Sequence, residues 1–391
     1  MPEPAAFRHD PVRSVLPRAG PWRPDWETEP AVVGHRRLTY RNERLGRTIQ
    51  VPVSSTPAVV PGFGCVVASD DGFVRLYSRR LENVVWERRV PASVYASVLV
   101  DPSRQHLLVT TTTGLVSCFT FTGAQVWQTR LGSAVCATPT LAPDGSAVVV
   151  ACFEHQVRSL DLEDGRPVFE TQVPAPWHRD VGGLASSRDP YATPAAVLDG
   201  VVVAAGESAL LVRPDGKVVW ETPLGASVRA SPVSIAATGE VLVVTTAGRA
   251  FFLNAADGSR RGRVDLGAKV TASPALSGGT VVVGLVTGES VGLSVEHEVR
   301  WRTVLGAPRD HTSWSVLPNG AFIATVDRGN VLCLRPEDGG FVWETSQVLG
   351  EPDHDPRMDI SPVAGPDGAL YCASYAGSLY EFAFPRTEDQ S

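Results

Sequence analysis

One short phrase recurs eight times along this chain, and it constrains the fold more than any other feature of the sequence. The phrase begins with a small hydroxyl residue and usually a proline, continues with two valine-rich runs and an acidic residue–glycine turn, and usually ends in tryptophan. Its opening pairs are Thr56-Pro57, Ser97-Val98, Thr138-Pro139, Thr193-Pro194, Ser231-Pro232, Ser273-Pro274, Ser313-Trp314 and Ser361-Pro362. A period of about 40 residues with about four short apolar runs per copy predicts the four-stranded blades of a β-propeller.

The interior of one copy supports this interpretation. Residues 201–205, 209–212 and 218–221 are apolar, largely β-branched runs of strand length, separated by residues suited to tight turns. Because one small sheet cannot bury apolar side chains on both faces, neighbouring blades must cover them. The closing position holds tryptophan in five copies: Trp86, Trp127, Trp220, Trp301 and Trp343. Phe169 and Gly262 replace it in the third and fifth copies.

The eighth copy ends after Phe384 without a fourth strand. The segment Asn42–Ile49 precedes Thr56 at about the same offset at which fourth strands precede the next copy elsewhere, so we predict that it completes the last blade and leaves few exposed strand edges. The predicted fold is an all-β, eight-bladed propeller with four antiparallel strands per blade, closed by an N-terminal strand. Residues 1–40 are then a flexible arm, residues 41–385 the propeller and residues 386–391 a tail.

Composition limits the partners. The formal charge is −7 and the pI is about 5.7, so no basic surface for nucleic acid is expected. No apolar run has the length of a signal peptide or a membrane span, which predicts a cytoplasmic protein without membrane insertion. The six cysteines are scattered without CxxC spacing, which predicts reduced, mostly buried thiols.

The phrase Ser-Pro-x-x, Val-x-Val, Asp-Gly-x-x-x-Trp resembles the pyrroloquinoline-quinone-type propeller repeat over roughly residues 42–385. That family includes quinone-dependent dehydrogenases and the periplasmic scaffold of the outer-membrane β-barrel assembly machinery. The resemblance implies the fold. Its dehydrogenases carry a vicinal disulfide and a calcium site, whereas no two cysteines are adjacent here. We therefore expect neither bound quinone nor quinone-dependent dehydrogenase activity.

One position in the phrase varies while its neighbours do not. Two residues before each opening pair, between positions that mostly hold valine and alanine, stand Ser54, Tyr95, Cys136, Tyr191, Arg229, Thr271, His311 and Asp359. Period-2 alternation places these side chains opposite the packed valines, where the innermost strands begin. They are predicted to ring one mouth of the central channel, unless they are simply solvated loop ends that tolerate any polar residue.

Three longer connections lead toward the same predicted face and add Trp177, His178, Arg309, Asp310, Trp314, His354 and Arg357. Together with Arg229 and Lys269, these residues predict a site for a small anionic or polar ligand or a protein partner, with the two tryptophans as contact area. No cofactor is predicted. One alternative is a divalent metal held by His178, His311, His354 and nearby carboxylates.

The other alternative is a non-redox enzyme of lyase, isomerase or cyclase type. In this hypothesis His311 and Asp359 transfer protons opposite Tyr95 and Tyr191, because a histidine with a near-neutral pKa can accept and return a proton.

Overall fold

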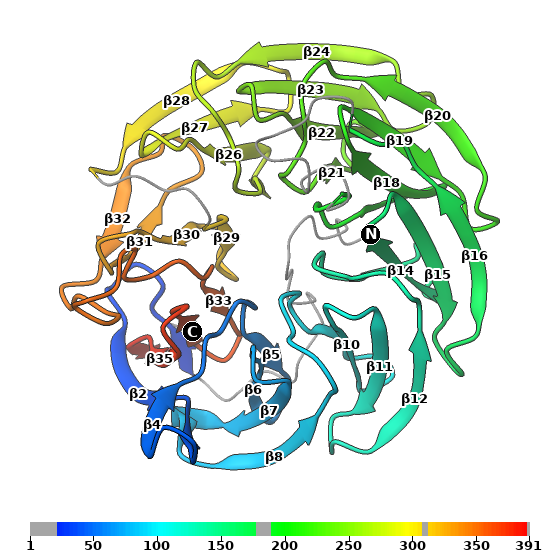
Figure 1. The fold of residues 1–391 in the computed structure, drawn as a ribbon. Helices are drawn as coiled ribbons and strands as arrows, with labels where there is room; N and C mark the ends of the chain where they lie inside the picture. Colours follow the sequence, from blue (N-terminus) through cyan, green and yellow to red (C-terminus); the bar gives the residue numbers. More distant parts are fainter. Residues whose placement is uncertain (1–21, 177–188, 307–311, 389–391) are drawn as a thin grey trace.

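The computed structural model describes residues 22–176, 189–306 and 312–388, which form a closed ring of four-stranded antiparallel sheets (Figure 1). From the axis outward, blades 1 to 4 are β5–β8 (Ala58–Val60, Gly64–Ala68, Phe73–Ser78, Val84–Arg89), β9–β12 (Leu99–Asp101, His106–Thr110, Leu115–Thr120, Gln125–Arg130), β13–β16 (Thr140–Leu141, Ala147–Cys152, Gln156–Asp161, Pro167–Gln172) and β17–β20 (Ala195–Val197, Gly200–Ala205, Ser208–Val212, Val218–Pro223). Blades 5 to 7 are β21–β24 (Val233–Ile235, Glu240–Val244, Arg249–Asn254, Arg260–Asp265), β25–β28 (Ala275–Ser277, Thr280–Gly284, Glu289–Ser294, Val299–Val304) and β29–β32 (Ser315–Val316, Phe322–Thr325, Val331–Leu334, Phe341–Glu344). The predicted all-β propeller with eight four-stranded blades is confirmed.

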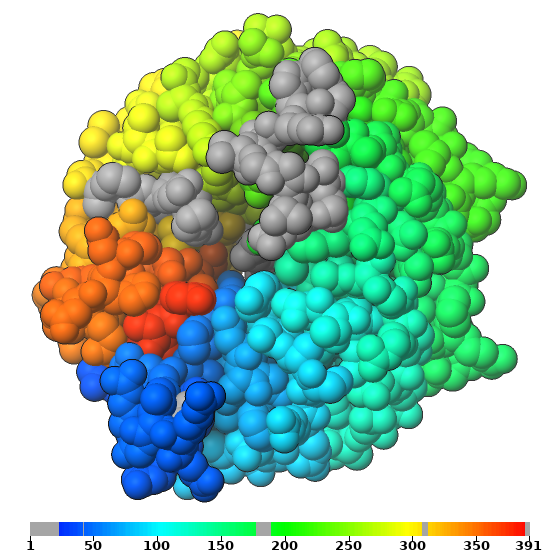
Figure 2. Space-filling view, viewed as in Figure 1, coloured from blue at the N-terminus to red at the C-terminus, as the bar shows by residue number. Residues whose placement is uncertain are grey.

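Blade 8 is closed by an N-terminal strand, but the predicted segment was wrong. Strands β33 (Val363–Ala364), β34 (Ala369–Ala373) and β35 (Ser378–Ala383) are completed by β2 (Ala31–Arg37). Residues 42–49 instead fall in a hairpin of β3 (Thr39–Asn42) and β4 (Arg47–Gln50), which projects from the rim (Figure 2). Because this hairpin separates the closing strand from Thr56, the offset rule selected a segment too late in the chain. The propeller consequently begins within the predicted arm.

Segments near the start and the end of the described chain meet at blade 8. Strand β1 (Trp22–Pro24) pairs with β36 (Arg386–Glu388), so a segment predicted as arm and a segment predicted as tail form a small sheet. The indole of Trp343 in blade 7 donates a hydrogen bond to the Trp26 carbonyl (2.9 Å). The Trp26 ring in turn packs on Phe384 with 4.6 Å between ring centroids. Both ends of the chain therefore complete the junction of blades 7 and 8.

Burial explains why the blades need one another. The second strands of most blades, such as β6 and β18, are buried along their whole length, whereas fourth strands such as β8 bury one central position. Eight clusters of buried apolar side chains result, one between each pair of neighbouring blades. All six cysteines are buried and no disulfide joins any two of them, which confirms the prediction of reduced, mostly buried thiols.

The hydroxyl residue of the phrase has a structural role at the axis. The backbone N–H of each of five opening residues donates to the serine hydroxyl of the next blade, over 2.9–3.1 Å: Thr56 to Ser97, Thr193 to Ser231, Ser231 to Ser273, Ser273 to Ser313 and Ser313 to Ser361. These donors are buried and would otherwise lack an acceptor, so the serines satisfy them. The recurring Ser therefore belongs to the scaffold.

The closing tryptophans seal five junctions near the rim. Each indole N–H donates to a backbone carbonyl over 2.8–3.0 Å, with Trp86, Trp127, Trp220, Trp301 and Trp343 bonding Phe121, Leu162, Ala255, Pro336 and Trp26. In four of these junctions the ring also lies against a turn glycine of the following blade, with no room for a Cβ, as Trp86 does on Gly123. The tryptophans are packing residues, as their register predicts.

Candidate functional site at the mouth of the ring

The connection face is the face on which the fourth strand of one blade leads into the first strand of the next. The turns between second and third strands lie on the same face. Backbone hydrogen bonds join the two layers, such as Asp70 N–H to the Pro52 carbonyl (3.0 Å) and Thr112 N–H to the Ser93 carbonyl (3.0 Å). The layers therefore hold each other in place around the axis.

The variable position alternates with buried neighbours, as predicted. Val94 and Ala96 are buried, whereas Tyr95 between them is 41% exposed. Arg229 is exposed and Cys136 is buried, and the other described members are partly exposed: Ser54, Tyr191, Thr271 and Asp359. The scaffold therefore constrains the valines and alanines and leaves most of the variable side chains accessible.

An aromatic and cationic group forms on blades 3 to 5. The Arg229 guanidinium lies over the Tyr191 ring at 5.7 Å from its centroid, and the Phe153 ring packs against the same tyrosine with 5.6 Å between ring centroids. Such a guanidinium–phenol contact orients the cation. Nearby, the buried Asp189 carboxylate accepts a hydrogen bond from Gly206 N–H (2.8 Å). Burial raises the pKa of Asp189 to about 6, while the Arg229 charge acts in the opposite direction.

A second group forms around Asp70 on blade 1. Burial raises the pKa of this carboxyl to about 6, although Ser54 donates a hydrogen bond to Oδ2 (3.2 Å). Its Oδ1 is buried and makes no hydrogen bond to any residue that the structure describes. Burial also raises the pKa of Tyr95, and the charge of Asp70 adds to that effect. A phenol and a carboxyl that is partly protonated near neutral pH thus share this side of the mouth.

Blade 8 contributes the predicted Asp359 and His354 beside Tyr375. The Asp359 carboxylate accepts a hydrogen bond from Tyr375 N–H (2.8 Å). The His354 ring centroid lies 6.0 Å from that of the Tyr375 ring, and its Nδ1 donates a hydrogen bond to the Pro356 carbonyl (2.9 Å). Tyr375 itself is 42% exposed.

The remaining predicted residues divide into two sets. Lys269 is exposed, and Arg357 is partly exposed with its backbone N–H bonded to the Asp327 carbonyl (2.8 Å). Five predicted residues lie outside the described residues: Trp177, His178, Arg309, Asp310 and His311. The described ranges contain no group of three His, Cys, Asp or Glu side chains arranged for a metal. The metal and His311 hypotheses therefore stay predictions.

Trp314 is a correction. It was predicted to offer contact area to a ligand, but its side chain is fully buried and packs edge-on against Phe322 with 6.3 Å between ring centroids. Trp314 occupies the proline place of the phrase, where the first strand of a blade packs against its neighbours, and it belongs to the cluster between blades 6 and 7. Its departure from the phrase reflects packing at that place.

A family model described as outer membrane protein assembly factor BamB matches residues 70–186 and 177–317, which together span more than half of the chain. The chain belongs to this BamB-like family of quinone-type propellers. The predicted resemblance is thereby confirmed. The BamB-like propeller matches no curated protein. Within its described ranges, no helix has the length and apolar character that a membrane crossing requires.

Solved structures show how general this architecture is. BamB from Moraxella catarrhalis aligns with a TM-score of 0.70 at 16% identity, covering 91% of this chain and 100% of that one. The designed Ika8 protein aligns with a TM-score of 0.67 at 10% identity over 90% and 100%. The C-terminal WD40 domain of Sif2 aligns with a TM-score of 0.70 at 10% identity over 91% and 98%. At these identities the alignments establish a shared fold and nothing further.

Sequence reasoning missed Asp70, Phe153 and Tyr375. All three stand just after a second strand, in turns whose backbone bonds the connections. A comparison of the eight copies at this turn position would have found them, because the copies hold unlike residues there, as they do at the variable position.

Proposed function

We propose that this BamB-like propeller is a protein-binding scaffold whose mouth holds an extended partner segment carrying an acidic side chain. Propellers of this type commonly mediate protein interactions. The observation that carries the proposal is the set of exposed or partly exposed side chains Tyr375, Tyr95, Tyr191 and Arg229 around the mouth. Tyrosine and arginine are the residue types that contribute most binding energy in protein interfaces.

The distribution of charge supports an acidic segment. Arg229 on blade 5 and Lys269 on blade 6 are both exposed and form a cationic arc on adjacent blades. A carboxylate bound there would gain charge-assisted hydrogen bonds. The phenols of Tyr375 and Tyr95 lie on blades 8 and 2, which do not adjoin that arc, whereas Tyr191 on blade 4 contacts Arg229 directly. A segment of several residues can use both regions, whereas a small anionic ligand would use the arc alone.

Selection of displayed peptides against the purified propeller tests this function. Peptides that contain Asp or Glu beside apolar residues are expected, with binding at least about tenfold weaker for Arg229→Ala and for Tyr95→Ala. Matched controls are Arg261→Ala, on the outer strand β24, and Tyr40→Ala, on the rim hairpin, because both parent residues are exposed away from the mouth. An equal loss of peptide affinity in the control variants, or no loss in the mouth variants, would contradict the proposal.

A proton-transfer enzyme is the second candidate, and the raised pKa values of Asp70 and Asp189 favour it. A carboxyl with a pKa near 6 beside a tyrosine can exchange a proton at neutral pH. Native mass spectrometry with metal analysis of the purified protein separates the candidates. Turnover of a retained ligand by the wild type, absent in Asp70→Asn, would support the enzyme, whereas its persistence in that variant would contradict this role of Asp70.

A further inference from the structure

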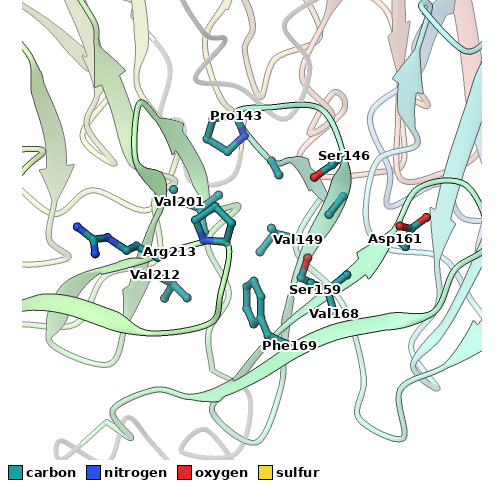
Figure 3. A pocket seen from close by; sticks show the side chains of 14 residues that line it. Pro143, Ser146, Val149, Ser159, Asp161, Val168, Phe169, Val201, Val212 and Arg213 are labelled. Atoms are coloured by element: carbon teal, nitrogen blue, oxygen red, sulfur yellow. The ribbon is translucent and has the colours of Figure 1, made fainter.

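A cavity lies between blades 3 and 4, on the face opposite the connection face. It is bounded by the turns between first and second strands and between third and fourth strands, and its volume is about 170 Å³. Its walls include Val149, Val201 and Val212, with Ser159 as a buried polar residue and Phe169 directed into it (Figure 3). The cavity occupies the one junction at which phenylalanine replaces the closing tryptophan.

The rest of this junction is unchanged, which makes the comparison with its neighbours direct. The turn that follows Arg213 has the same two backbone hydrogen bonds as the turn that follows Thr120 in blade 2. The Phe169 ring lies against Gly216 as the Trp86 ring lies against Gly123. Thr171, two residues after Phe169, donates to the Gly216 carbonyl (2.6 Å), as Thr129 donates to the Gly165 carbonyl (2.6 Å).

One partner is missing. Pro214 corresponds to Phe121, whose carbonyl accepts the Trp86 indole N–H (2.8 Å). No hydrogen bond from the described residues reaches the Pro214 carbonyl, although Pro214 lines the cavity. The buried apolar cluster here has eight members, against ten to fourteen at the other junctions, so this is the least filled gap. The position thus keeps an acceptor and an aromatic wall but lacks an indole.

We propose that the cavity between blades 3 and 4 binds a free, planar heteroaromatic molecule of about the size of indole, with a ring N–H donating to the Pro214 carbonyl. The ring would pack on Phe169 and the valines, an arrangement favourable for aromatic groups. An apolar cavity of roughly 150 Å³ is known to accept benzene, so about 170 Å³ suits one small ring system and little more. The site is separate from the mouth and does not depend on the function proposed there.

Isothermal titration of the purified protein with indole tests the site. One indole per chain is expected, with affinity reduced at least about tenfold in Phe169→Trp and in Ser159→Leu. The first variant supplies the missing indole, and the second places at 159 the leucine that stands at the corresponding positions 76 and 211. Two independent variants keep the test valid if one fails to fold. Arg261→Ala, at an exposed position on the outer strand β24 away from both the cavity and the mouth, is the matched control and should bind indole normally.

The ligand controls address the hydrogen bond and the source of the ring. 1-Methylindole, which lacks the N–H, should bind several-fold more weakly than indole. Absence of indole binding to the wild type, or equal binding to Phe169→Trp, would overturn the proposal. Binding of N-acetyltryptophanamide without binding of indole would also overturn it, because the site would then take a tryptophan side chain of a partner rather than a free molecule.

Discussion

At the junction of blades 2 and 3, the gap near the rim is filled by the Trp127 indole of the leading blade, whereas at the junction of blades 5 and 6 it is filled by the His297 imidazole of the following blade. Gly262 stands at the tryptophan position, and a Cβ there would come within 2.4 Å of His297 Nδ1. His297 itself takes the place of the turn glycine, with φ of 70°. Large and small residues have therefore exchanged sides, and the gap is filled in both cases.

The exchange changes the chemistry of the junction. His297 packs on Phe252 with 4.3 Å between ring centroids, and its Nε2 contacts the buried Glu240 carboxylate at 3.0 Å. The junction of blades 8 and 1 follows the same pattern, because Gly34 occupies the tryptophan position and Arg79 reaches back to the fully buried Glu381 (2.7 Å). Where the leading blade offers glycine, the following blade supplies a polar side chain and a buried carboxylate receives it.

The largest effect is expected from Gly262→Trp, which puts two rings into one gap. The new side chain would displace His297 and leave Glu240 buried without it, at a cost of about 4 kcal/mol in unfolding free energy. Adding His297→Gly should restore part of this loss by recreating the Trp–Gly pair. Urea denaturation of both single variants and the double variant measures the coupling. Additive losses would show that the two positions do not share the gap.

Glu381→Ala is expected to have the next largest effect, about 3 kcal/mol. Glu381 accepts hydrogen bonds from the Arg79 side chain and from the Arg80 backbone N–H, both in the helix η1 (Arg79–Leu81) of blade 1. Its loss leaves that N–H without its acceptor and weakens the contact between blades 8 and 1. The exposed Glu163→Ala is the control for urea denaturation. Equal urea midpoints for Glu381→Ala and Glu163→Ala would show that the Glu381 carboxylate does not stabilise the closure of the ring.

Trp127→Phe should cost about 2 kcal/mol, because it converts a sealed junction into the arrangement found at Phe169. The indole N–H bond to the Leu162 carbonyl (2.9 Å) is lost, and space opens beside it. Thermal and urea denaturation measure the change. Val126→Ala, one residue earlier on the same strand and 41% exposed, is the control. A loss no greater than that of the control would mean that the indole is not what seals this gap.

The sequence predicted the blades because the repeat supplies eight readings of one unit, and errors in one copy are corrected by the others. It predicted the wrong closing strand because a spacing rule cannot anticipate the hairpin β3–β4 between β2 and Thr56. Gly34 in β2 also hides the strand from a search for tryptophan, although the close approach of the Arg80 carbonyl, 2.3 Å from a hypothetical Cβ, requires glycine there.

The candidate site was only partly predictable for a similar reason. Tyr95, Tyr191 and Arg229 stand at a fixed offset from the opening pair, so a comparison of copies isolates them. Asp70 and Tyr375 reach the mouth from turns that the phrase does not mark. Gly262 and His297, which replace the usual Trp–Gly pair at one junction, belong to different copies of the repeat. Such relations arise from contacts between blades, which become visible only when the ring is assembled.

The smallest effect, and the only gain, is expected from Phe169→Trp. The new indole can fill the cavity and donate to the Pro214 carbonyl, which should add about 1 kcal/mol to the unfolding free energy. Val126→Trp, at the 41% exposed position that precedes the closing tryptophan of blade 2 and away from the cavity, is the control for added aromatic surface. Paired with Trp127→Phe, this variant forms a reciprocal test on two junctions of one molecule. If Phe169→Trp destabilised the protein, the cavity would not accommodate an indole. The two junctions would then be alike in their turns but not in the space beside the closing ring.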